Sequence, residues 1–156
     1  MNIRQASSQE AAELTRIAHD AKRYWGYPEH WLQRWEADLT LTPEFIADNH
    51  VYVAEEGDRV SGFYALSIKD KSAELEHLWV APDSIGTGVG KELFLNAMQK
   101  AAELRVTSVE ISSDPNAEGF YQKMGAYRMG ETTSELDGET RILPRLTIEP
   151  NNSQDK

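Results

Sequence analysis

Hydrophobic positions near the N-terminus recur at the three- and four-residue spacing of a helix. The stretch Ser7-Ser8-Gln9-Glu10 has the residue types of a capping box, so we expect a helix to begin there. The apolar residues on its buried face are Ala11, Leu14, Ile17, Ala18 and Ala21. We expect this helix to end at Gly26 and further helices to begin at Pro28 and Thr42-Pro43. A short edge strand is expected over residues 2–6.

The pattern changes to the two-residue period of strands at His50. Turns at Gly57-Asp58 and Asp70-Lys71 divide the next stretch into three strands, the last of which ends at Val80. The remaining elements are helices over 88–104 and 116–124 and strands over 106–112, 126–132 and 141–148. The helix over 88–104 has an apolar face of Leu93, Ala97, Ala101 and Leu104. Because strands and helices alternate after the hairpins, we expect a mixed α/β sheet that is covered by helices.

Composition restricts the class of protein. The length of 156 residues predicts one domain over 1–150 with a polar tail over 151–156. The net charge of −10 leaves no basic surface for nucleic acid or an anionic membrane. The chain has no Cys, and its four His have no ligand spacing, so we expect no metal. A polar N-terminus and the lack of a long apolar run favour a cytoplasmic protein; a homodimer stays open.

The segment from Ile85 to Lys91 carries the strongest chemical signal. Gly86, Gly88 and Gly90 alternate there, between the strand that ends at Val80 and the following helix. Without side chains the backbone can approach a ligand, and its N–H groups and the helix dipole favour an anion. The spacing fits neither a P-loop nor a dinucleotide fingerprint. The residues alone also allow a turn that only connects strand to helix.

A second motif follows the next strand, in the segment Asp114-Pro115-Asn116-Ala117 and its continuation to Gly125. Together the two segments resemble the GNAT superfamily of acetyl-coenzyme A-dependent N-acyltransferases, over about residues 50–148. Gly88 and Gly90 match its Gln/Arg-x-x-Gly-x-Gly/Ala motif, although Ile85 replaces the polar residue. Its second motif is matched by Ala117, Phe120, Tyr121 and Gly125, in a variant with Asn116.

The resemblance implies a fold and a cofactor site. The fold is a GNAT-type α/β sandwich, with a mixed, mostly antiparallel sheet, a splayed parallel pair of strands and helices on both faces. Acetyl-CoA would contact the backbone of Leu78, Trp79 and Val80 through its pantetheine, and Asn116 and Tyr121 nearer the thioester. Its pyrophosphate would lie on Ile85, Gly86, Thr87, Gly88, Val89, Gly90 and Lys91.

The resemblance also implies the reaction, which is direct transfer of acetyl from acetyl-CoA to a primary amine of a small-molecule or peptide acceptor that the sequence does not identify. Tyr121 matches the family's general acid, and the chain offers neither a Cys nor a Gly-x-Ser-x-Gly nucleophile for an acyl-enzyme. We predict Glu76 as the base, with Glu74, His77 or water as alternatives. Trp25 and Tyr27 are equally compatible with an acceptor pocket and with the core. The competing hypothesis is a non-catalytic acyl-CoA sensor or interaction module on the same fold. A second alternative is a nucleotide-phosphate binder that uses the same glycine segment.

Overall fold

The computed structural model describes residues 1–150, and the expected polar tail over 151–156 lies outside the described residues. Its strands are β1 (Asn2–Gln5), β2 (His50–Glu56), β3 (Arg59–Lys69), β4 (Ser72–Val80), β5 (Ser108–Ser112), β6 (Tyr127–Leu136) and β7 (Glu139–Ile148). Its helices are α1 (Ala11–Tyr24), α2 (Glu29–Arg34), α3 (Glu36–Leu39), α4 (Pro43–Asp48), α5 (Val89–Glu103) and α6 (Glu118–Lys123). Short 3₁₀ helices cover Ser8–Glu10 and Pro82–Ser84.

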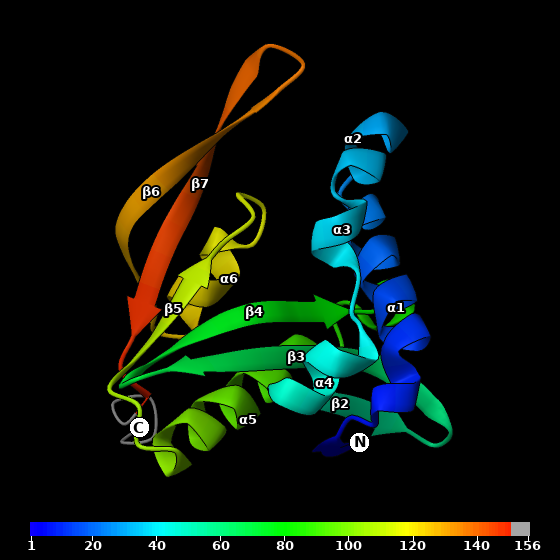
Figure 1. Ribbon diagram of the computed structural model, residues 1–156, viewed down its shortest axis with the longest axis vertical. Helices are drawn as coiled ribbons and strands as arrows, with labels where there is room; N and C mark the ends of the chain where they lie inside the picture. The colour runs from blue at the N-terminus through cyan, green and yellow to red at the C-terminus, as the bar shows by residue number, and fades with distance from the viewer. Residues whose placement is uncertain (151–156) are drawn as a thin grey trace. The chain divides into compact units, whose positions relative to one another are not determined.

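The described strands form one mixed sheet in the order β1-β2-β3-β4-β5-β7-β6 (Figure 1). The pair β4 and β5 is parallel, whereas the registered pairs β1–β2, β2–β3, β5–β7 and β6–β7 are antiparallel. The predicted mixed, mostly antiparallel sheet with one parallel pair is confirmed. The chain divides into two compact units, one of residues 1–66 and 77–94, the other of 67–76 and the residues from 95 onward.

The first unit buries its core between helices and one face of the strands β2 and β3. Strand alternation places Val51, Val53 and Phe63 on that face, each at most 1% exposed. Apolar residues of α1, α3 and α4 pack against them, as the helical spacing predicts for α1. Burial of these side chains, rather than helix propensity, stabilises helices as short as α3 and α4.

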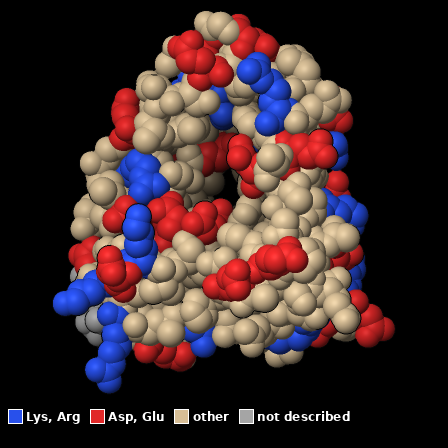
Figure 2. All heavy atoms as spheres, viewed as in Figure 1, with Lys and Arg blue, Asp and Glu red and all other residues tan. Residues whose placement is uncertain are grey.

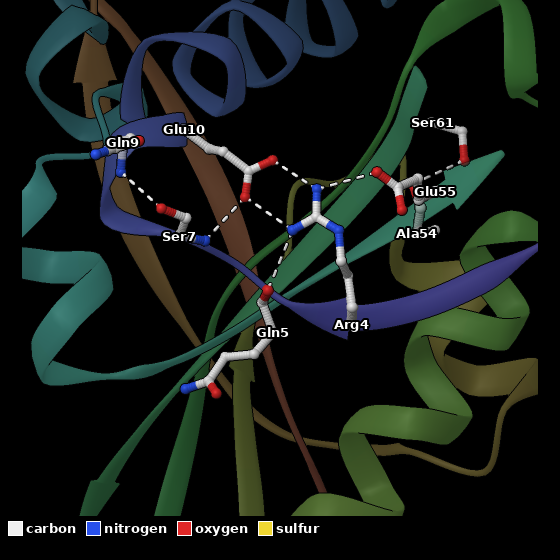
Figure 3. Close-up of polar contacts among 8 residues, drawn as sticks. All are labelled: Arg4, Gln5, Ser7, Gln9, Glu10, Ala54, Glu55 and Ser61. Carbon is white, nitrogen blue, oxygen red and sulfur yellow. Dashed lines mark hydrogen bonds and ion pairs between the residues drawn. The ribbon is translucent and has the colours of Figure 1, made fainter. Parts of the chain in front are cut away.

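The capping box lies at the start of the 3₁₀ helix Ser8–Glu10, which leads directly into α1, and Arg4 of β1 contacts it (Figure 3). The Ser7 hydroxyl accepts from the Gln9 N–H, and the Glu10 carboxylate accepts from the Ser7 N–H over 2.8 Å. Arg4 donates to Glu10 over 2.8 and 3.0 Å and to Glu55 of β2 over 3.2 Å. Hydrogen bonds from Arg4 therefore lower the pKa of the Glu10 carboxyl, and the predicted cap is confirmed.

The second unit is built around β5 and the long hairpin β6–β7. The first residues of β4 pair with β5, where Glu74 lies opposite Glu110. Strand β7 pairs with both β5 and β6, and the hairpin turns at Asp137-Gly138 as predicted. The twisted hairpin runs from the end of α6 to the end of the described chain (Figure 1).

Some boundaries differ from the sequence expectation. The hairpin strands are longer than predicted, and α3 was not predicted because four residues show no helical period. Helix α6 begins at Glu118, since Asp114 and Asn116 form a turn in front of it. Leu104 was expected on the buried face, but it follows the end of α5 and is 39% exposed.

Candidate active site

The glycine segment forms an exposed turn that enters α5. Gly86 and Gly88 have φ of +84° and +91°, a region that residues with a Cβ rarely adopt. A Cβ at either position would meet no atom within 4 Å, so the space beside this backbone is open. The Thr87 N–H and hydroxyl both donate to the Ser84 carbonyl, which fixes the turn. Glu92 donates to the Gly88 carbonyl over 3.0 Å, the first backbone bond of the helix.

This geometry fits an anionic group. The first N–H groups of an α-helix have no acceptor within the helix, and they carry the positive end of its dipole. At the start of α5, which has fifteen residues, these groups belong to Val89, Gly90 and Lys91. Ile85, which replaces the expected polar residue, is 41% exposed. The backbone N–H groups of residues 89–91 can donate to an anion, and the apolar side chain of Ile85 adds no polar contact.

The end of β4 lies close to β3 because position 62 is glycine. A Cβ on Gly62 would lie 2.7 Å from the Trp79 carbonyl oxygen and 3.0 Å from a methyl of Leu93. The Ala81 N–H donates to the Ser61 carbonyl over 2.8 Å just beyond the strand. The side chains of residues 78–80 are half-buried. The end of the strand for which the resemblance implies pantetheine contacts is thus held close to β3.

His77 is a packed side chain. Its ring lies 5.9 Å from the ring centroids of both Phe45 and Phe63, and its Nδ1 accepts from the Trp79 indole N–H over 3.0 Å. Burial lowers the pKa of His77 from 6.5 to about 4, so the ring is neutral at pH 7. An Nδ1 that accepts this bond cannot take up a proton without losing it. These contacts fit a structural histidine better than a base.

Aromatic residues gather where the chain turns from α1 into α2. Tyr27 lies 5.0 Å from Trp35, edge to face, and 5.9 Å from Trp31. The ammonium of Lys22 lies over the rings of Tyr27 and Trp35. Trp25 is 44% exposed and contacts Tyr24. Of the two predicted acceptor residues, Tyr27 therefore joins an aromatic cluster, while Trp25 lies at the surface.

The carboxylates of β4 line a cavity of about 640 Å³ in the second unit. Because Ala73 and Leu75 are buried, alternation turns Glu74 and Glu76 to the opposite face, as predicted. Arg145 donates to Glu74 over 3.0 Å and to Glu110 over 2.8 Å, so Glu74 is engaged in an ion-pair network. Glu76 accepts a hydrogen bond of 2.7 Å from Ser67.

The cavity residues that sequence reasoning missed include Ser67, Glu110 and Arg145. These three belong to β3, β5 and β7 and share no motif. The register of Ser112 with Arg145 brings the arginine beside the β5 carboxylate. The sequence does place Glu110 and Arg145 in predicted strands. It does not show that these two strands are neighbours in the sheet, so it could not bring the two side chains together.

Tyr121 lies on α6 and is 7% exposed. Burial raises the pKa of its hydroxyl well above the ordinary value, and the charge of Asp114 adds to this shift. The phenol therefore stays protonated at neutral pH. Asn116 is exposed, and its backbone and side-chain N–H groups donate to the Asp114 carboxylate over 2.9 and 3.0 Å. Asp114 thus fixes the turn before α6.

Acidic side chains are spread over the face of the molecule in Figure 2, with Lys and Arg among them. No helix within the described part of the chain has the length and apolar character needed to cross a membrane. Within residues 1–150 we find no group of three or more His, Asp or Glu arranged to hold a metal ion.

Comparison with known proteins decides the family. Residues 5–138 match the family model of the acetyltransferase (GNAT) domain. The chain belongs to the GNAT acetyltransferase family. It is 33% identical over 109 residues to the peptidyl-lysine N-acetyltransferase YjaB of Escherichia coli strain K12, and the match covers 69% of each chain. The resemblance inferred from the two motifs is confirmed, and the chain is an acyltransferase of this family.

Two other relatives extend this comparison. The 5-NmdU N-acetyltransferase of Pseudomonas phage PaMx11 is 26% identical over 143 residues, which are 90% of this chain and 95% of the phage protein. The solved PaiA N-acetyltransferase of Thermoplasma acidophilum, in complex with coenzyme A, has a TM-score of 0.74 and 21% identity over 95% of this chain and 98% of that chain. That structure shows that this GNAT chain shares the fold of a coenzyme A-binding protein.

Proposed function

We propose that this GNAT protein transfers acetyl from acetyl-CoA directly to a primary amine. The observation that carries the proposal is the exposed, positive-φ glycine turn at the start of α5, which fits a diphosphate. The coenzyme A complex of a structural relative supports the same ligand. The family's activity on amines, as in the peptidyl-lysine enzyme YjaB, supports the reaction. A cytoplasmic location and a homodimer stay predictions from the sequence.

The backbone performs the binding. The N–H groups of Val89, Gly90 and Lys91 at the start of α5 hold the pyrophosphate on the segment 85–91. Backbone groups of Leu78, Trp79 and Val80 hold the pantetheine. A backbone N–H on β4 donates to the thioester carbonyl oxygen, which becomes negative during attack. Acetyl-CoA supplies an activated acetyl group as a thioester. Asn116 contributes a polar side chain on the pantetheine side, through its exposed amide.

Tyr121 acts on the departing sulfur. A new carbon–nitrogen bond replaces the carbon–sulfur bond, the nitrogen loses a proton, and the sulfur gains one. A thiol has a pKa of about 8.5, below that of the buried Tyr121, so full proton transfer from the phenol is uphill. We infer that the Tyr121 O–H stabilises the developing thiolate by donating a hydrogen bond. The proton that the nitrogen releases to the base is then passed on, through water, to the sulfur.

A strand carboxylate accepts the proton from the amine. Glu76 is the base we propose, either directly or through water, because it is exposed and accepts one hydrogen bond from Ser67. Glu74 is less suited because Arg145 occupies its oxygens. His77 is less suited because its Nδ1 accepts from Trp79 and its ring is packed. On the acceptor side, Trp25 and Tyr27 stay the predicted contacts.

The test pairs Gly88→Ala with Gly57→Ala. Both glycines have positive φ and open space at the Cβ, so neither alanine meets a neighbouring atom, and the backbone strain is larger at Gly88, with φ of +91°, than at Gly57, with φ of +62°. Alanine at position 88 should shift the backbone out of its positive-φ conformation. We therefore expect calorimetry to show coenzyme A affinity about tenfold or more weaker in Gly88→Ala and unchanged in Gly57→Ala. Equal affinities in the two variants would refute the loop assignment.

A thiol-release assay with acetyl-CoA and a panel of amines tests the reaction. We expect turnover on at least one primary amine. Tight binding of acetyl-CoA without thiol release on any amine would instead support the non-catalytic sensor. Release without an added amine would argue for hydrolysis.

A further inference from the structure

Three aromatic rings of the first unit surround one ammonium group. The Nζ of Lys22, on α1, lies 4.5 Å from the ring centroid of Trp35, 5.1 Å from Tyr27 and 6.0 Å from Trp79. These distances lie within the range of cation–π attraction. We call the rings of Tyr27, Trp35 and Trp79 the aromatic box.

The walls of the aromatic box are fixed by their neighbours. Tyr27 meets Trp35 edge to face at an interplanar angle of 87°, and Trp31 supports both rings at 5.9 Å. The Trp79 indole is oriented by its hydrogen bond to His77. Trp35 and Trp79 also pack against the core. The rings are therefore pre-organised, whereas Lys22 reaches them on a flexible four-carbon chain.

We propose that the aromatic box is a binding site for an alkylammonium group of the amine acceptor, and that the Lys22 ammonium is an internal occupant which the acceptor displaces. The Lys22 ammonium already lies against these ring faces, which shows that the aromatic box accommodates a cation. The half-buried position of Lys22 leaves a way out for its side chain.

The bound group is a second charge of the acceptor. An amine must be neutral to attack a thioester, while ring faces attract the charged form. The box therefore holds a nitrogen that does not react. This step rests on the proposed function, in which the backbone of Trp79 contacts pantetheine while its side chain forms a wall of the box. The acceptor class is then a polyamine or another molecule with two cationic nitrogens.

Lys22 sets the affinity of the aromatic box. An occupant tethered to the same chain competes at a high effective concentration, so an external cation binds weakly while Lys22 is present. Removing the ammonium should expose the rings and strengthen external binding. Replacing it by another cation should keep the box filled. These opposite expectations distinguish competition from a purely structural role of Lys22.

The binding test uses tetramethylammonium, which cannot be acetylated, and omits acetyl-CoA. Its dissociation constant is measured for the wild type, Lys22→Met and Lys22→Arg by following the indole N–H signals in ¹H–¹⁵N NMR. We expect Lys22→Met to bind about tenfold more tightly than the wild type and Lys22→Arg to resemble the wild type. The Trp35 and Trp79 signals should move, and that of the exposed Trp25 should not.

Several results would overturn the proposal. Equal affinity in Lys22→Met and the wild type would show that Lys22 does not block a cation site. Movement of the Trp25 signal alone would place the cation elsewhere. In the Lys22→Met background, Trp35→Leu should remove binding; if the circular dichroism shows that this variant is folded and binding persists, the box is not the site. Neutral tert-butanol should leave the Trp35 and Trp79 signals in place, and an equal shift would contradict a cation site.

A kinetic test connects the aromatic box to the reaction. With acetyl-CoA, Lys22→Met should lower the KM for 1,4-diaminobutane several-fold more than the KM for butylamine, which has no second nitrogen. An equal change for both amines would contradict a site for the second nitrogen. If neither amine is acetylated while tetramethylammonium still binds, the proposed function fails and the cation site stands.

Discussion

At the scale of single residues, the burial of Tyr121 determines how its hydroxyl acts. A phenol whose pKa is raised by burial keeps its proton and serves as a hydrogen-bond donor. In Tyr121→Phe the ring still fills its buried position, but the donor is lost. We expect kcat to fall about 100-fold while coenzyme A affinity stays close to that of the wild type.

The measurement combines steady-state thiol release with calorimetry of coenzyme A binding. Phe120→Leu is the matched control, since it changes the neighbouring aromatic residue, whose ring lies 5.3 Å from that of Tyr121, and keeps the hydroxyl. A kcat in Tyr121→Phe equal to that of the wild type at pH 7 and at pH 9 would exclude the hydroxyl from the reaction.

His77 makes stability depend on pH. Its pKa is about 4 in the folded protein and 6.5 in the unfolded chain, so between these values the unfolded chain binds a proton that the folded protein does not. The free energy of unfolding is therefore highest above pH 6.5. It falls by up to about 3 kcal/mol, on account of His77, as the pH decreases toward 4. In urea unfolding, the free energy of unfolding of His77→Gln should therefore fall less between pH 7 and pH 5 than that of the wild type. Parallel losses would assign the pH dependence to other groups.

At the scale of elements, the spacing of β3 and β4 depends on the absence of one Cβ. Gly62→Ala places a carbon 2.7 Å from the Trp79 carbonyl oxygen, which is backbone and cannot rotate away. We expect the free energy of unfolding to fall by about 1–3 kcal/mol.

Gly119→Ala is the control for this substitution. Gly119 lies on α6 with open space at its Cβ, so alanine should raise the free energy of unfolding by about 0.5–1 kcal/mol through helix propensity. Urea denaturation measures both variants. A destabilisation of the same size in both would mean that contact with Trp79 is not the cause.

The elements that the sequence predicted well are those with a local signal. The capping box before α1, the Thr42 cap of α4 and the turn at Asp137-Gly138 each depend on neighbouring residues only. The four-residue helix α3 has no such signal. Its single buried residue, Leu39, packs against core residues that are distant in the sequence, so no local pattern marks it. The motif positions of the candidate site were accessible for the same local reason.

At the scale of the whole molecule, the sequence could not show which distant side chains meet. Arg145 joins Glu74 and Glu110 because three strands lie in register, and Lys22 meets the aromatic rings because the chain turns back after α1. Neither encounter follows from spacing along the chain. The net charge, in contrast, can be counted from the sequence alone, and it predicts how the stability of the protein depends on salt.

A net charge of −10 makes the folded protein repel itself at low ionic strength. Salt screens this repulsion, and it also weakens exposed ion pairs such as Arg16–Glu13, but such pairs contribute little. We therefore expect the Tm to rise by about 2–4 °C between 20 and 200 mM KCl, which corresponds to about 1 kcal/mol.

The variant Asp48→Lys/Glu139→Lys changes two exposed carboxylates and brings the net charge from −10 to about −6, since each substitution adds two charges. Its Tm should rise less with salt. An equal rise in both proteins would attribute the effect to the ions themselves rather than to the charge of the protein.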